Sequence, residues 1–364
     1  MISKAYADHA WEQAAAILAI DSPTGFTKNA AQWAKTAFEK LGFSATITTK
    51  GGVLVDLGGK DENDALLLAA HADTLGAMVA EIKGNGRLRV TALGGMSANN
   101  GEAENVRVYT RCGEVVEGTL QLCNASTHVN KDYATTQRSF DTTEVVLDED
   151  VNSAKDAADL GIQTGDIVCF DPRTRRTASG YLKSRFLDDK LSVGILLGFA
   201  KYLADNRIVP ERRTYVHITV YEEVGHGAAT IAKDADELLA VDMGCVGNGL
   251  NCKETQVSIC VKDSHGPYDY EIVERLIALA KENGVEGWAF TLHRPSYLPF
   301  ITYCRNRELR RQMYMAYNTI GAKGNSNDNR EIVKEIVNSR LELAQLLGYS
   351  TYSDYVLEER MAQN

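Results

Sequence analysis

The strongest indication of the fold is the segment Ala65-Leu-Leu-Leu-Ala-Ala-His-Ala-Asp73. Its first six residues form a continuous apolar run, which is typical of a strand buried on both faces of a parallel sheet. The run leads directly into His71 and Asp73, whose side chains can bind a metal or move a proton. Because ligands gather at the carboxyl ends of the strands in an open parallel sheet, this stretch predicts an α/β fold with a functional site at the strand end.

The flanking segments continue this pattern. Apolar residues three and four positions apart predict helices at His9–Leu18, Lys28–Leu41, Lys190–Leu203 and Tyr268–Lys281. Short apolar runs predict strands at Ala45–Thr49, Val53–Leu57, Tyr215–Tyr221, Leu238–Val241 and Val257–Val261. We therefore expect an α/β domain, with a mostly parallel central sheet and flanking helices, built from residues 1–75 and 178–284.

Residues 76–177 differ from these flanking segments in their pattern of apolar and polar residues. Short alternating runs lie between Gly, Asn and Asp turns, at Val79–Ile82, Leu88–Thr91, Val106–Tyr109, Glu144–Leu147 and Ile167–Phe170. Such alternation predicts a small β-barrel-like domain inserted into the α/β domain.

The composition changes again in the last part of the chain. Residues 295–364 hold 7 of the 16 Tyr but only 3 of the 30 Gly. The helical period predicts helices at Glu308–Ile320, Asn329–Leu347 and about Tyr352–Met361. An α/β domain would still be adding strands here, so residues 285–364 are expected to form an all-helical tail.

Length, net charge and cysteine pattern limit the number of domains, the partners and the location that we expect for the chain. A chain of 364 residues is long enough for two domains or for one domain with a large insertion. A net charge of −10 argues against nucleic acid or an anionic membrane as a partner. Met1–Asp8 lacks a signal-peptide pattern, and the seven cysteines are scattered without a CxxC pair. These features favour a cytoplasmic protein with reduced thiols.

Acidic residues and one histidine end four separate predicted segments. The clusters are His71-Ala-Asp73, Asp188-Asp189, Glu222-Glu223 and Asp242. Hard divalent ions prefer carboxylate oxygens, and a zinc-like site prefers at least one imidazole. Several carboxylates and one histidine delivered by different strands suit a pair of metals that share a bridging carboxylate.

Each cluster has a chemical interpretation and an ordinary one. His71 can bind a metal while Asp73 hydrogen-bonds its far ring nitrogen, or it can be a plain strand-end histidine. One carboxylate of Glu222-Glu223 can bind metal while the other takes a proton from the attacking water, or the pair can be a solvated turn. Asp188-Asp189 could equally cap the following helix.

Five blocks of the chain resemble the signature blocks of one metallopeptidase family. They are Ala70-His-Ala-Asp-Thr74, Ser184-Arg-Phe-Leu-Asp-Asp-Lys190, Tyr221-Glu-Glu-Val-Gly-His-Gly227, Val241-Asp-Met-Gly244 and Val261-Lys-Asp-Ser-His-Gly-Pro-Tyr-Asp269. The family is that of the glutamyl aminopeptidases and tetrahedral aminopeptidases, which carry two metals per subunit. The resemblance covers residue 1 to about 284 in family order and spacing, and it implies a phosphorylase/hydrolase-like fold.

The resemblance implies a role for each matching residue. Its metal ligands would be His71 and Asp242 at one metal, Asp188 as the bridge, and Glu223 at the second metal. Glu222 would be the general base, and Asp73 would orient His71. It also implies two divalent ions (zinc or cobalt), peptides with a free N-terminus as substrates, and homo-oligomers formed through the inserted β domain.

The family completes its second metal site with a histidine near its C-terminus, and no residue of this chain matches that histidine. His226, His265 and His293 are nearby, but each is expected to be an ordinary surface or core histidine. The aminopeptidase prediction therefore keeps an alternative, a catalytically incomplete chain that binds metal. A second alternative is an interaction protein that uses the helical tail.

The tail resembles a different peptidase family. The matching blocks include Glu286-Gly-Trp-Ala-Phe-Thr-Leu292, Arg294-Pro-Ser-Tyr-Leu-Pro-Phe300, Asn306-Arg-Glu-Leu-Arg310, Tyr314-Met-Ala-Tyr-Asn318 and Asp328-Asn-Arg-Glu-Ile-Val333. They are similar to a non-catalytic helical stretch of the thimet oligopeptidase and peptidyl-dipeptidase family. That family's catalytic His-Glu-x-x-His helix is absent from the sequence, so its activity is not expected. The chain is thus interpreted as a chimera joined near residue 285.

Overall fold

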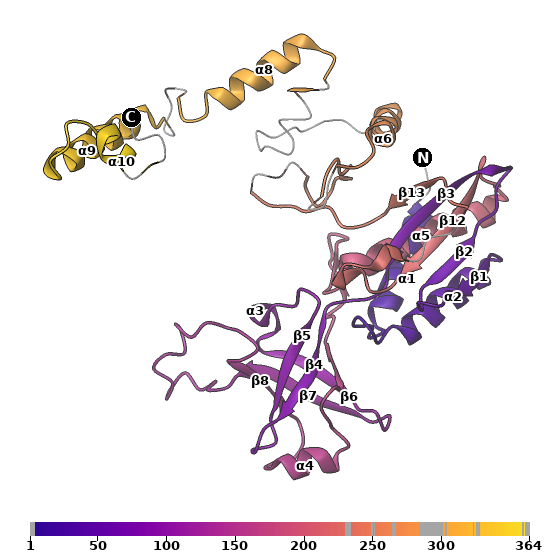
Figure 1. The fold of residues 1–364 in the computed structure, drawn as a ribbon. Helices are drawn as coiled ribbons and strands as arrows, with labels where there is room; N and C mark the ends of the chain where they lie inside the picture. The colour runs from indigo at the N-terminus through magenta and orange to yellow at the C-terminus, as the bar shows by residue number, and fades with distance from the viewer. Residues whose placement is uncertain are drawn as a thin grey trace. The chain divides into compact units, whose positions relative to one another are not determined.

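The computed structural model describes residues 4–229, 234–248, 250, 252–263, 267–283, 301–302, 304–322, 324, 328–358 and 360. The chain forms two compact units, Met1–Met243 and Gly244–Asn364 (Figure 1). Across the described ranges, none of the helices combines the length and the apolar character that crossing a membrane requires.

A five-stranded sheet organises the first unit. Its strands, in spatial order, are β1 (Ser44–Ile47), β2 (Val53–Asp56), β12 (Arg212–Thr219), β3 (Asp61–His71) and β13 (Glu237–Ala240). β12, β3 and β13 are parallel neighbours, whereas β2 runs antiparallel to both β1 and β12. Four of the five strands therefore point the same way, which confirms the mostly parallel sheet.

The apolar run of β3 is buried on both faces of this sheet, as its sequence predicts. Leu68 and Ala70 contribute to a large core on one face. Ala65 and Leu67 lie on the other face, where they pack with Tyr215 of β12. Because successive side chains of a strand point to opposite faces, an unbroken apolar run is needed to serve both layers.

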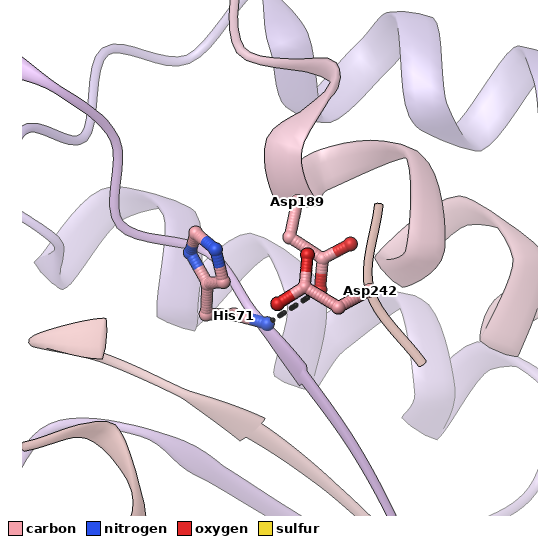
Figure 2. Close-up of side chains that lie close together, drawn as sticks. All are labelled: His71, Asp189 and Asp242. Carbon is pink, nitrogen blue, oxygen red and sulfur yellow. Dashed lines mark hydrogen bonds between the residues drawn. The ribbon is translucent and has the colours of Figure 1, made fainter. Parts of the chain in front are cut away.

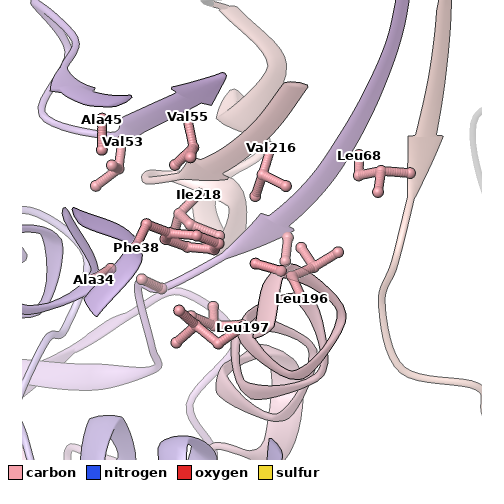
Figure 3. Close-up of a cluster of buried hydrophobic side chains, with 14 of the residues drawn as sticks. Ala34, Phe38, Ala45, Val53, Val55, Leu68, Leu196, Leu197, Val216 and Ile218 are labelled. Carbon is pink, nitrogen blue, oxygen red and sulfur yellow. The ribbon is translucent and has the colours of Figure 1, made fainter. Parts of the chain in front are cut away.

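Helices α2 (Lys28–Lys40) and α5 (Leu187–Asn206) supply the large core (Figure 3). Helix α1 (Lys4–Leu18) packs against α5 and needs a glycine at the contact. A Cβ atom at Gly194 would lie 2.6 Å from the backbone oxygen of Ala10. The missing side chain therefore allows the two helix backbones to approach closely.

A closed six-stranded barrel lies within the first unit (Figure 1). Its strands, in spatial order, are β4 (Gly76–Ile82), β5 (Leu88–Leu93), β8 (Thr143–Leu147), β7 (Val115–Leu122), β6 (Glu104–Tyr109) and β9 (Ile167–Phe170). All neighbouring strands are antiparallel, and the barrel encloses a hydrophobic core of its own. The prediction of a barrel-like insertion is thus confirmed, although β7 was not among the predicted strands.

Short elements complete the barrel region. Helices α3 (Ala98–Gly101) and α4 (Ala154–Asp159) lie between its strands in sequence, and β10 (Arg175–Arg176) pairs with β11 (Leu182–Lys183) before the chain reaches α5.

The regular elements described after residue 300 are all helices, which confirms the helical tail. The second unit's described elements include α6 (Tyr270–Glu282), α8 (Arg307–Asn318), α9 (Arg330–Leu346) and α10 (Tyr352–Leu357). The strand predicted at Val257–Val261 is wrong. Val257 is 79% exposed, and no strand pairs with this segment among the described residues, so the apolar run lacks the ladder that a strand requires.

Candidate metal centre

Side chains from four parts of the first unit meet at one edge of the sheet. His71 ends β3, and Glu222 and Glu223 open the short 3-10 helix η1 (Glu222–Val224) that follows β12. Asp242 follows β13 by two residues, and the Asp188-Asp189 pair lies in the first turn of α5. Because β3, β12 and β13 are parallel neighbours, their carboxyl ends lie together, and this places the side chains in one cluster.

His71 is the centre of this cluster and is only 1% exposed. Its Nδ1 lies 2.9 Å from the backbone oxygen of Asp73 and 3.6 Å from the Asp73 carboxylate. Since a carbonyl oxygen can only accept, Nδ1 carries a proton, and Nε2 faces the carboxylates. Nε2 lies 2.9 Å from Asp188 Oδ1 and 3.5 Å from Glu222 Oε2. Burial alone would lower the pKa of His71, but its hydrogen bonds to Asp188 and Asp73 raise it to about 11.

Two groups of potential metal ligands share His71. In the first group, ligand atoms of His71, Asp189 and Asp242 lie within 4.8 Å of one another (Figure 2). The backbone N–H of His71 also donates to Asp189 Oδ2 at 3.0 Å. In the second group, ligand atoms of His71, Asp188 and Glu223 satisfy the same limit. The imidazole therefore stands between two sets of carboxylates.

Asp73 is completely buried and connects His71 to the glutamate pair. Its Oδ2 accepts a hydrogen bond from the Thr24 hydroxyl at 2.7 Å and lies 3.4 Å from the backbone N–H of Glu223. Its Oδ1 accepts the backbone N–H of Glu222 at 3.2 Å. The carboxylate thus joins three chain segments that are far apart in the sequence.

Burial raises the pKa of four carboxylates of the cluster. Burial, followed by repulsion from Asp242, raises the pKa of Asp189 to about 8. Burial, followed by repulsion from Asp188, raises the pKa of Glu223 to about 7. Burial likewise raises the pKa of Asp242 and of Glu222. Taking such groups out of water disfavours their charged form unless a cation stands near them.

A divalent cation fits this set of donors. An imidazole and carboxylate oxygens are the ligands that zinc-like ions bind in proteins. Within the described ranges, no Lys or Arg forms an ion pair with these carboxylates. The cluster therefore concentrates negative charge with His71 as its one cationic partner, and a bound cation would neutralise it.

The structure brings together every site residue predicted from the sequence and adds two. Asp189 was noted as part of the Asp188-Asp189 pair but was not assigned as a ligand, and only its adjacency to Asp188 could have suggested it. Thr24 was missed altogether. His226 is exposed and stacks on Tyr221, with ring centroids 5.1 Å apart, and belongs to neither ligand group. His265 and His293 lie outside the described residues.

The protein is thus an α/β protein with a carboxylate–imidazole centre at its strand ends and an inserted β-barrel. Residues 51–291 match the M42 glutamyl aminopeptidase family, which is more than half of the chain. The chain therefore belongs to the M42 glutamyl aminopeptidase family.

Individual proteins show the same relationship. The chain is 39% identical over 271 residues to the putative aminopeptidase YhfE of Bacillus subtilis, a match covering 74% of this chain and 78% of that protein. Its structure is similar to that of the TET1 peptidase of Pyrococcus horikoshii, with a TM-score of 0.65 and 21% identity, over 76% of this chain and 82% of the other. At 21% identity, the similarity to the TET1 peptidase shows a shared fold alone.

The tail matches a second family, as the sequence predicted. Residues 300–364 match Peptidase family M3. Over 89 residues the chain is 46% identical to the oligopeptidase A of Haemophilus influenzae, which is 23% of this chain but only 13% of that protein. The comparisons support a chain composed of segments from two peptidase families.

Proposed function

We propose that the cluster around His71 is the active site of a metal-dependent aminopeptidase, which removes residues from the N-terminus of peptides. The observation that carries this proposal is the pair of ligand groups that share His71, at the strand ends of a chain belonging to an aminopeptidase family. His71 and Asp189 are each only 1% exposed, so water has little access to these two side chains.

The ligands divide between two ions in this proposal, and zinc or cobalt suits their donor atoms. His71 and Asp242 would hold one ion, and Glu223 would hold the second. Asp188 would bridge them, which is supported by its place beside both His71 and Glu223. Asp189 lies in the first group and would support that ion directly or through its hydrogen bond from the His71 backbone. A bound divalent ion polarises a peptide carbonyl and lowers the pKa of water.

Glu222 is the general base of the proposed reaction. Its Oε2 lies 3.5 Å from His71 Nε2, and its side chain is 49% exposed, so it faces both the ligands and solvent. Glu222 takes a proton from the water that attacks the first peptide carbonyl, and a new C–O bond forms. The same proton then passes to the leaving nitrogen as the C–N bond breaks, which releases the amino acid and the shortened peptide. Asp73 holds the backbone of Glu222 during these transfers.

Each part of the chain would have a different role in this proposal. Residues 1–75 and 178–284 would form the catalytic domain, and the insertion at 76–177 would mediate dimerisation and assembly in a cytoplasmic homo-oligomer. The related TET1 peptidase assembles into a tetrahedron or a large octahedral shell, which supports self-association here. Residues 285–364 would add a helical tail without catalytic residues. Sedimentation of the purified chain with and without the tail measures whether it assembles.

A second candidate is a chain that binds a single ion and turns over little. It is favoured by the fact that both ligand groups share the same imidazole, with no second histidine in either group among the described residues. The number of ions bound per chain separates the two candidates, because the aminopeptidase described above needs two.

The variant Glu222→Gln tests the proposed reaction. In a zinc-loaded or cobalt-loaded protein, it is expected to lower kcat for a chromogenic amino-acid anilide by about 10²–10⁴, the usual contribution of a general base. Its metal content should equal that of the wild type, because Glu222 is not a proposed ligand. Glu149→Gln, at an exposed glutamate of the barrel, is the matched control. Full activity of Glu222→Gln would remove the proposed base, and an inactive wild type holding one ion would favour the second candidate.

A further inference from the structure

The segment Ser22–Thr24 lies directly against Ala72–Thr74, the segment that carries Asp73. Pro23 and Thr74 form a parallel bridge, the backbone N–H of Thr24 donates to the oxygen of Thr74 at 3.1 Å, and the N–H of Thr74 donates to the oxygen of Ser22 at 2.9 Å. The Ser22 hydroxyl donates to the oxygen of Ala72 at 2.7 Å. The two segments are therefore joined along their whole length.

These contacts aim a hydroxyl group at the Asp73 carboxylate. Thr24 is 7% exposed and Asp73 is 0% exposed, so water has little access to either side chain. The Thr24 hydroxyl lies 2.7 Å from Asp73 Oδ2, which makes it the shortest contact to that oxygen among those of the described residues. The neighbouring contact to Oδ2, from the N–H of Glu223, is longer at 3.4 Å.

We propose that Thr24 is a positioning residue of the metal centre: its hydroxyl fixes the Asp73 carboxylate in the orientation that also receives the backbone N–H groups of Glu222 and Glu223. This inference rests on the proposed function, because it concerns how the same site is held in place. The Thr24 side chain bonds to Asp73 rather than to one of the proposed metal ligands, so Thr24 acts through Asp73.

The Asp73 carboxylate has to satisfy several contacts at once. It connects the end of β3, which presents His71, to the start of η1, which presents Glu222 and Glu223. Two of its contacts are long, at 3.4 and 3.6 Å, so they constrain its rotation weakly. The short bond from Thr24 is the contact that fixes the orientation of Oδ2, and residues that orient metal ligands contribute strongly to metal affinity.

The backbone that precedes Thr24 is held in place by contacts of its own. Asp21 accepts two hydrogen bonds from Arg107 and one from Tyr109, both on barrel strand β6. The buried Lys190 donates to the backbone oxygen of Ile20. The hydroxyl is therefore presented by a backbone anchored to the barrel and to α5, and it cannot readily follow a displaced carboxylate.

The chain provides a matched set of variants. Thr24→Val replaces the hydroxyl with a methyl group of similar size, and Thr24→Ala removes it without adding a contact. Thr24→Ser keeps the hydroxyl and is the rescue variant. Thr27→Val makes the same chemical change three residues away, at a threonine that is also 7% exposed and whose side chain does not cap α2.

The measurement is zinc affinity, determined by competition with a chromophoric chelator, together with the visible absorption spectrum of the cobalt-loaded protein. Thr24→Val and Thr24→Ala are expected to bind zinc about 10–100-fold more weakly and to show an altered cobalt spectrum. Thr24→Ser and Thr27→Val should match the wild type in both. Thermal unfolding of the metal-free proteins, followed by circular dichroism, identifies any variant that fails to fold.

The possible outcomes distinguish a failure of this inference from a failure of the proposed function. Wild-type zinc affinity in a folded Thr24→Val or Thr24→Ala protein overturns the inference while leaving the proposed function intact. An equal loss of affinity in Thr24→Ser or Thr27→Val also overturns it, because the hydroxyl would then not be responsible. A wild-type chain that binds no metal contradicts the proposed function itself.

Discussion

The contact between Asp21 and the barrel provides a sensitive test of how the first unit is held together. The Asp21 side chain is 9% exposed and accepts hydrogen bonds from Arg107 Nε at 2.7 Å, from Arg107 Nη2 at 2.8 Å and from the Tyr109 hydroxyl at 2.7 Å. Replacing Asp21 with Ala leaves all of these donors without their acceptor. The segment between α1 and α2, which contains Asp21, would then lose its ion pair with Arg107 of β6.

The size of the effect follows from the exposure of the partners. Hydrogen bonds to a charged group contribute about 1.5–3 kcal/mol each. The Arg107 side chain is 27% exposed and can recover part of its bonding from water, so the total is reduced. We expect Asp21→Ala to lower the free energy of unfolding by about 3 kcal/mol, within the range for breaking a buried ion pair. The midpoint of thermal unfolding should fall by roughly 6–12 °C.

The assay is urea denaturation of the metal-free protein followed by far-UV circular dichroism, with a surface ion pair as the control. Asp159 pairs with Lys155 on α4, and their side chains are 61% and 79% exposed. Asp159→Ala is therefore expected to change the free energy of unfolding by less than about 1 kcal/mol. If Asp21→Ala costs no more than Asp159→Ala, the buried contact does not hold the loop to the barrel and the reasoning is refuted.

Three further predictions concern the helix contact, the barrel and the metal. Gly194→Ala is expected to lower stability by about 1–3 kcal/mol in thermal unfolding, because its Cβ would lie 2.6 Å from the backbone oxygen of Ala10; unchanged stability would show that the helices can separate. Burial alone would raise the pKa of Glu144, but hydrogen bonds from Lys83 and Arg87 outweigh burial and lower it. This carboxylate therefore stabilises the barrel above its unfolded pKa of 4.5 and loses that contribution as the pH falls through its lower folded value. Acidification from about pH 7 to 3 should thus destabilise the wild type more than Glu144→Gln in parallel denaturation curves, and equal losses would contradict the assignment. Adding zinc at 100 times its dissociation constant should raise the free energy of unfolding by about 2.7 kcal/mol, reversibly with a chelator, and an unchanged melting curve would argue against a metal centre.

The sequence predicted the elements whose signal is local. The run Ala65–Ala70 has no polar interruption, so it identified a strand covered on both faces. Buried and more exposed residues alternate along β7 (Val115–Leu122). Its sequence contains polar residues and Gly118, which made the segment harder to identify as a strand. Local patterns therefore located all five strands of the sheet and five of the six strands of the barrel.

Contacts between distant segments could not be predicted in the same way. The spacing of His71 and Asp73 indicated that the two would interact, but not that the Asp73 backbone oxygen would lie nearest Nδ1. The bond from Thr24 to Asp73 joins residues 49 positions apart, and no local pattern marks it. Both members of the Asp188-Asp189 pair contact His71, Asp188 at Nε2 and Asp189 at the backbone N–H, and this likewise depends on how the first turn of α5 meets the sheet.

Incubation with one peptide and with its N-acetylated form tests whether the chain is an aminopeptidase. The purified, metal-loaded chain is incubated with both peptides, and the products are identified by mass spectrometry over time. We expect stepwise loss of single residues from the free N-terminus and no cleavage of the acetylated peptide. Internal cleavage, or an intact free peptide in the presence of a chain holding two ions, would contradict it.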